Sequence, residues 1–193
     1  MKKFPLVFDL ETKHSFRDFS DPKKLEITVA AIFNYENNET KVFTEKEINK
    51  LFPIFESASY IIGYNVKNFD LAVLQAYYPG RVEVFPTFDI LEDIKEKIGK
   101  RISLNEVVIA TLAKKKTGHG LQAINLFKEG RIDELKKYCL DDVMLTKELF
   151  EYGIKNQEIF YLNEKGKVTI KVDWKKYLEE EKKTSDTPLT LPF

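Results

Sequence analysis

Two carboxylates separated by one residue stand near the start of the chain, inside the apolar segment Leu6–Thr12. Leucine, valine and phenylalanine in succession predict a buried strand, and side chains alternate along a strand, so Asp9 and Glu11 should project from the same face. Two buried anions this close repel each other and are costly to desolvate unless a cation lies between them. The pattern therefore predicts a divalent metal site, whereas a strand that simply ends at solvent is the alternative for an isolated pair.

A phenol and a third carboxylate lie late in the chain, on a helix predicted from about Ile132 to Tyr152. Tyr138 and Asp142 are four residues apart, so they should face the same side of the helix, one turn from each other. The alternative places Tyr138 at the edge of the core and makes Asp142 a solvated charge. The neighbouring Asp141 should point to solvent.

Strands and helices that could position these residues alternate along the sequence. Short β-rich runs at 27–35 and 41–44 follow the first strand, with a polar turn between them, and the three strands predict an antiparallel meander. Further strands are expected at 59–63 and 82–85. With helices between them, the strands predict an α/β or α+β fold built on a mixed sheet, without an internal repeat.

Helix starts are indicated by capping boxes. Thr44 with Glu47 form one capping box, ahead of a helix that Pro53 should kink or end. Ser103 with Glu106 form a second. Other helices are expected at 71–78, from 88 to Gly99, on both sides of Gly130, and at 132–152.

The C-terminal region is expected to contain a β-hairpin followed by a mobile tail. The strands of the hairpin should be 159–162 and 168–172, and periodicity is lost from Lys175 onward. We therefore expect a core domain over 1–155, an appended hairpin and short helix over 156–177, and a flexible tail over 178–193.

The composition is that of an ordinary globular domain, with 43% hydrophobic residues in 193. Lys+Arg and Asp+Glu both number 31, so contact with nucleic acid would need a local basic patch and a wrapping mode is disfavoured. The single Cys139 excludes an intramolecular disulfide and a cysteine-based zinc site. Since no apolar run reaches membrane length or forms a leader peptide, we expect a cytoplasmic protein that does not enter a membrane.

Three short motifs, taken in order, resemble those of the DEDD superfamily of 3′-to-5′ exonucleases: Phe8–Thr12, Gly63–Asp70 and Tyr138–Asp142. A tyrosine four positions before the last aspartate is the mark of the DEDDy branch, whereas the other branch would need a histidine where this chain has Lys137. The part from Lys116 to Val143 is also similar to bacterial and phage DnaQ-like exonucleases.

The resemblance covers roughly residues 4 to 152 and implies a ribonuclease H-like exonuclease fold, with three antiparallel strands first and flanking helices. It also implies two Mg²⁺ or Mn²⁺ ions held by Asp9, Glu11, Asp70 and Asp142. Asp9 would bridge both ions, Glu11 and Asp142 would hold the ion that activates water, and Asp70 would act through waters. Tyr138 would orient the attacking water.

The implied activity is hydrolysis of single-stranded 3′ ends to nucleoside 5′-monophosphates by a two-metal-ion mechanism. DNA is slightly favoured over RNA because of the likeness to proofreading domains and because of the C-terminal peptide described below, and DNA replication or repair is the expected setting. Within the enzyme class the alternative is an exoribonuclease. Outside it, the alternative is a catalytically silent nucleic-acid-binding module, which would have no physical reason to keep four mutually repelling carboxylates.

Contacts with substrate are expected near the motifs. Thr12 would meet the terminal 3′-hydroxyl, and Asn65 and Phe69 would hydrogen-bond and stack on the last nucleotides, although Asn65 could equally cap a helix and Phe69 could belong to the core. A basic loop, 114–120, would bind a backbone phosphate or simply be solvated. The expected substrate-binding residues are Leu10, Thr12, Asn65, Phe69, Lys116 and His119.

The last five residues, Leu189-Thr190-Leu191-Pro192-Phe193, are similar to the short peptides by which bacterial replication proteins dock on the β sliding clamp. The likeness departs at the first position, where that motif has glutamine and this chain has Pro188. It implies docking through Leu189, Leu191 and Phe193.

Overall fold

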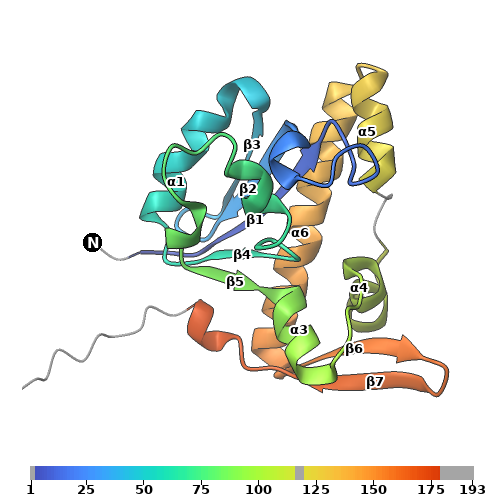
Figure 1. Cartoon of the computed structure of the whole chain (residues 1–193). Helices are drawn as coiled ribbons and strands as arrows, with labels where there is room; N and C mark the ends of the chain where they lie inside the picture. Colours follow the sequence, from blue (N-terminus) through green and yellow to red (C-terminus); the bar gives the residue numbers. More distant parts are fainter. Residues whose placement is uncertain (1–2, 116–119, 179–193) are drawn as a thin grey trace, which may run out of the picture.

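The computed structural model describes residues 3–115 and 120–178. Its centre is a five-stranded mixed sheet with the strand order β3-β2-β1-β4-β5 and helices on both faces (Figure 1). This mixed α/β architecture is the fold class that the sequence predicted. The strands of the sheet are β1 (Leu6–Thr12), β2 (Ile27–Asn34), β3 (Glu39–Thr44), β4 (Ile61–Gly63) and β5 (Thr87–Asp89).

The central strand β1 runs antiparallel to β2 and parallel to β4. With β2 antiparallel to β3, the first three strands form the predicted meander. β1 and β4 pair only through Leu6 with Ile61 and Val7 with Ile62. Beyond Val7, the edge of β1 on the β4 side therefore faces the chain that follows β4.

Side chains of β1 alternate between two apolar layers. Leu6, Phe8 and Leu10 belong to the layer that includes residues of α1 and α2, whereas Val7 belongs to the layer that includes residues of α6. Figure 1 shows α6 (Ile132–Asn156, orange) lying along the sheet on the latter side. Asp9 and Glu11 share the face of Val7, so β1 directs both carboxylates toward α6.

Helices begin where the capping boxes indicated, with one difference. Thr44 and Glu47 form the first box, but the helix that follows is a 3-10 helix, η2 (Glu45–Leu51), which continues as α1. Pro53 lies at the start of α1, where a missing N–H costs nothing, so it begins the α-helical part and does not end it. Ser103 and Glu106 form the second box. The other helices are α1 (Phe52–Ser57), α2 (Asp70–Leu74), α3 (Ile90–Ile98), α4 (Leu104–Leu112) and α5 (Gly120–Lys128).

The predicted strand at 82–85 is wrong. These residues include the 3-10 helix η3 (Val82–Val84), and the strand β5 lies further on, after Pro86. Val82 and Phe85 are both buried while Val84 is 66% exposed, a spacing of three that suits a 3-10 turn and not strand alternation. Other boundaries shifted: β4 begins at Ile61, and α2 ends at Leu74.

The predicted β-hairpin is present as β6 (Glu158–Asn163) and β7 (Gly166–Lys171), with Gly166 at a φ of 112° in its turn. It packs on the same apolar layer as α6, and the hydroxyl of Thr111 in α4 accepts from Phe160 N at 2.9 Å. A short 3-10 helix, η4 (Lys175–Tyr177), follows. The division into a domain, a hairpin and a tail stays a prediction.

Part of the sequence-based expectations falls outside the described residues. These are Lys116, His119 and the clamp-like peptide with Leu189, Leu191 and Phe193, so docking on a sliding clamp stays a prediction. Within 3–115 and 120–178, no helix is both long and apolar enough to cross a membrane.

Candidate active site

Three carboxylates from β1 and α6 converge on one point. Asp9, Glu11 and Asp142 each place a carboxylate oxygen within 4.8 Å of the others. Glu11 is 9% exposed and Asp142 1%, while Asp9 is half-buried. Strand alternation aims the first two at α6, and α6 carries the third on the turn that faces them.

This donor set fits a hard divalent cation. Carboxylate oxygens are the ligands that Mg²⁺ and Mn²⁺ prefer, and the partial burial of the group weakens the screening of its negative charge by water. Three such groups within 4.8 Å repel one another unless a cation or protons offset their charge. Asp9, Glu11 and Asp142 are therefore the residues that would hold the ion.

Asp70 approaches the same region from the edge of β1 on the β4 side. It is the first residue of α2, only 3% exposed, and its Oδ1 accepts a hydrogen bond from Leu10 N at 3.0 Å. Burial, and next the charge of Asp9, raise the pKa of the Asp70 carboxyl well above its usual value. Asp70 thus binds the backbone of β1 between Asp9 and Glu11, although it is not one of the three clustered carboxylates.

Tyr138 lies on α6 one turn before Asp142 and is 4% exposed, whereas Lys137 is exposed. The next residue, Cys139, is fully buried. Its thiol donates toward Asp9, with Sγ 3.5 Å from the carbonyl oxygen and 3.7 Å from Oδ2. Burial, followed by the charge of Asp9, raises the pKa of this thiol, which keeps it protonated as a donor to the carboxylate.

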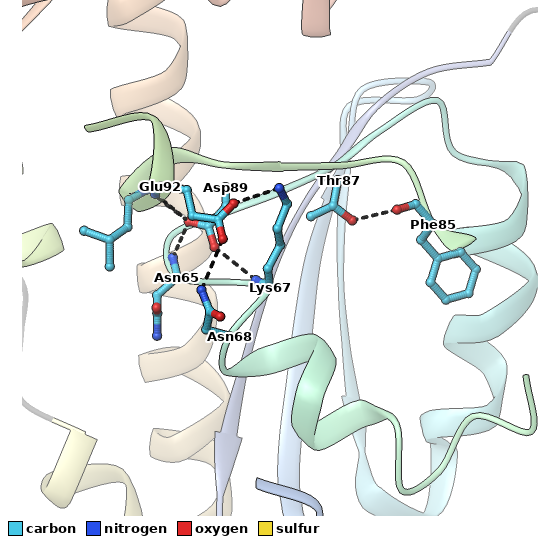
Figure 2. A network of polar contacts seen from close by, with 8 residues as sticks. Asn65, Lys67, Asn68, Phe85, Thr87, Asp89 and Glu92 are labelled. Carbon is cyan, nitrogen blue, oxygen red and sulfur yellow. Dashed lines mark hydrogen bonds and ion pairs between the residues drawn. The ribbon is translucent and has the colours of Figure 1, made fainter. Parts of the chain in front are cut away.

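The loop before Asp70 is held by a buried carboxylate, that of Asp89 (Figure 2). Asn65 N donates to Asp89 Oδ1 at 2.9 Å, and Lys67 N donates to Oδ2 at 3.0 Å. The backbone of Asn65 has a φ of 66°, in the left-handed region that asparagine tolerates better than most residues. Its side-chain oxygen accepts from Arg101 Nη2 at 2.8 Å.

The remaining predicted contact residues differ in what they offer. Thr12 is 5% exposed, and its hydroxyl donates to the His14 carbonyl at 2.7 Å. The Leu10 side chain is buried on the sheet face opposite the carboxylates, so only its backbone is near the site. Phe69 is half-buried, and its ring centroid lies 5.7 Å from that of Phe16, which is 53% exposed.

Sequence reasoning missed Asp89, Cys139 and Phe16 as parts of this region. One signal for Cys139 was available, since it lies three residues before Asp142 and so shares a side of the helix with it. Asp89 directly precedes an amphipathic helix, which is typical of a capping residue, but nothing local indicates its reach to Asn65.

Comparisons with known proteins agree with this architecture. A solved family B DNA polymerase from the hyperthermophilic archaeon Pyrobaculum calidifontis superposes on 80% of the chain with a TM-score of 0.61 and 17% identity. The zinc-bound form of E. coli ExoI in complex with single-stranded DNA covers 81% with a TM-score of 0.50 and 15% identity. At such identities the likeness shows the fold alone.

The chain spans only 25% of the polymerase and 41% of ExoI. No curated protein matches the chain in sequence. The family model described as the RNase H superfamily, however, matches residues 6–154, which include β1, the loop with Asp70 and most of α6. With its mixed sheet and its acidic cluster between β1 and α6, the chain belongs to the RNase H superfamily.

Proposed function

We propose that the protein is a metal-dependent 3′-to-5′ exonuclease of the DEDDy type that acts on single-stranded ends, DNA before RNA, and releases nucleoside 5′-monophosphates. The observation that carries the proposal is the convergence of Asp9, Glu11 and Asp142 within 4.8 Å. The fold shared with an ExoI that was solved with single-stranded DNA supports the choice of substrate.

Two divalent ions, when bound, would neutralise the scissile phosphate, activate the attacking water and stabilise the leaving oxygen. Asp9, Glu11 and Asp142 would hold one ion. Asp70, together with Asp9, would take part in holding the second ion. The hydrogen bond from Leu10 N to Oδ1 fixes the orientation of the Asp70 carboxylate for that task.

The other residues of the site would position reactants. A phenol is a poor base at neutral pH, so Tyr138 would orient the attacking water and would not deprotonate it. Cys139 would hold the Asp9 carboxylate by its S–H group. Hydrolysis then breaks the bond between phosphorus and the O3′ atom of the preceding nucleotide, which leaves with a proton from solvent.

Aromatic side chains beside Asp70 would bind the end of the strand. Phe69 directly precedes Asp70, and the exposed Phe16 ring extends the apolar surface away from it. Unpaired bases stack on such rings whatever their sequence, whereas a base pair at the end would have to open first. These contacts favour single-stranded ends.

The direct test uses 5′-labelled single-stranded DNA and RNA of one sequence, each with Mg²⁺, Mn²⁺ or a chelator. We expect a ladder of 3′-shortened products that requires metal, faster on DNA, and absent for Asp142→Asn. Faster shortening of RNA would identify the exoribonuclease alternative. Binding without shortening under every condition would identify the silent module and reject the proposal.

A further inference from the structure

Asp89 is a buried acid that the proposed chemistry does not use. It is 2% exposed, closes β5, and pairs in register with Gly63 at the end of β4. Its carboxylate accepts from the first turn of α3, at 3.0 Å from Leu91 N and 3.4 Å from Glu92 N. By these contacts alone it is an N-cap, the usual role of an aspartate before a helix.

The same carboxylate also accepts from a segment that lies more than 20 residues earlier. Asn65 N and Lys67 N donate to its two oxygens at 2.9 and 3.0 Å, so Asp89 Oδ1 is shared between the loop and the helix. Figure 2 shows the Asp89 carboxylate at the centre of these contacts, between the loop and α3. Both loop N–H groups would otherwise need another acceptor.

The loop between Gly63 and Asp70 makes a sharp turn. β4 ends at Gly63, and within seven residues the chain must turn through Asn65, whose φ is 66°, and deliver Asp70 to Leu10 N. Asparagine tolerates this left-handed conformation better than most residues, but the conformation still costs free energy that the contacts of the loop must offset. Side-chain contacts of the loop with Glu92, from Lys67 at 2.8 Å and Asn68 at 3.3 Å, are at the surface, where they stabilise little. Asp89, by contrast, binds the backbone of the loop from a buried position.

We propose that Asp89 is a positioning residue of the active site: it fixes the backbone of 65–67 and thereby places Asp70 against β1. For its effect on catalysis this inference rests on the proposed function. For the order of the loop it stands on the hydrogen bonds alone, so the two claims can fail separately.

The decisive variant is Asp89→Ser. A serine at an N-cap still accepts from the first turn of a helix, but its hydroxyl is too short to bridge to Asn65 and Lys67 as well. Thr44→Ala is the matched control, because it removes the side-chain hydrogen bond of Thr44 to Glu47 at the start of η2, at the opposite edge of the sheet, and leaves the loop untouched. Asp89→Asn, which keeps the size but only one accepting oxygen, replaces the serine variant where that fails to fold.

Hydrogen exchange of the metal-free proteins, followed residue by residue by NMR, is the first readout. In Asp89→Ser we expect the backbone N–H groups of Asn65 and Lys67 to exchange at least about tenfold faster, because each loses its hydrogen bond to a charged acceptor. In Thr44→Ala they should exchange as in the wild type. Unchanged exchange in Asp89→Ser overturns the proposal.

Steady-state hydrolysis of a single-stranded oligonucleotide at saturating Mn²⁺ is the second readout. A misplaced Asp70 should lower kcat of Asp89→Ser by up to about a hundredfold while KM stays within about threefold, because positioning errors near 1 Å cost that much. Thr44→Ala should keep the wild-type kcat. Equal kcat in all folded variants rejects the catalytic part. An inactive wild type would reject the proposed function and leave the exchange result to decide the order of the loop.

Discussion

The amide of Leu10 donates to Oδ1 of Asp70 at 3.0 Å, across 60 residues of sequence. Pairing between β1 and β4 ends at Val7 and Ile62, so an aspartate side chain takes over as acceptor beyond that point. The bond joins the acid of the loop to the strand that carries Asp9 and Glu11. Asp70 therefore belongs both to the sheet and to the site.

The two roles of Asp70 can be separated by substitution. Asp70→Asn keeps an oxygen for Leu10 N and loses the charge, whereas Asp70→Ala leaves that buried N–H without its acceptor, which costs about 1–3 kcal/mol. Both variants should lose nuclease activity. In urea unfolding without metal, only the alanine variant should have a lower free energy of unfolding, and equal losses in both would contradict the structural role.

The charge of Asp70 also predicts an unusual dependence of stability on pH. Burial, and next the charge of Asp9, raise the folded-state pKa of the Asp70 carboxyl well above its ordinary value, so the folded protein binds this proton more tightly than the unfolded chain does. The resulting stabilisation is complete below the unfolded pKa and is lost as the pH rises through the folded pKa. In EDTA, the wild type should lose stability relative to Asp70→Asn as the pH rises from about 4. A difference in melting temperature between the two proteins that stays constant with pH would contradict this expectation.

The repulsion between the clustered carboxylates should lower the stability of the metal-free protein, and a bound metal ion should restore it. Asp142→Asn removes one negative charge from a site where three lie within 4.8 Å, so its metal-free form should melt at a higher temperature than the wild type. For a domain of this size each 1 kcal/mol corresponds to about 2–4 °C. Mn²⁺ should raise the melting temperature of the wild type and much less that of the variant. The same increase for both proteins would place the ion elsewhere.

Tyr138→Phe tests orientation against proton transfer. If the phenol only orients water, its loss should lower kcat by roughly tenfold to a hundredfold, far less than the loss of a carboxylate ligand, with KM nearly unchanged. The pH profile of kcat should keep its shape, since no titrating group of the reaction has been removed. A loss as large as that of Asp142→Asn, with an altered profile, would assign Tyr138 a chemical role.

Short-range geometry explains which parts of this site the sequence could predict. Strand alternation at Asp9 and Glu11, and the single helical turn from Tyr138 to Asp142, depend only on neighbouring residues, so both patterns are readable. The contact of Cys139 with Asp9 spans 130 residues, and the local pattern shows only that Cys139 shares a side of the helix with Asp142.

The misassigned strand has the same cause. Valine at 82 and 84 and Phe85 favour a strand locally, yet the edge next to β4 is taken by Thr87–Asp89, whose last residue meets Gly63. Pairing in the sheet, which the local sequence does not contain, decided which of two β-prone segments became β5. The same pairing brought Asp89 within reach of the loop before Asp70.

The exposed ring of Phe16 predicts a substrate effect that depends on strand length. Phe16→Ala should raise KM for a single-stranded oligonucleotide by roughly fivefold to a hundredfold, because stacking on one aromatic ring contributes about 1–3 kcal/mol per base. Hydrolysis of a p-nitrophenyl ester of thymidine 5′-monophosphate, which has no neighbouring base, should be unaffected. Phe19→Ala is the control, since that ring is also exposed but packs on His14 and not on Phe69. An equal rise in KM for both variants would mean that the segment with Phe16 and Phe19 binds substrate without a specific stacking contact. No rise for Phe16→Ala would mean that the oligonucleotide binds to another surface of the protein.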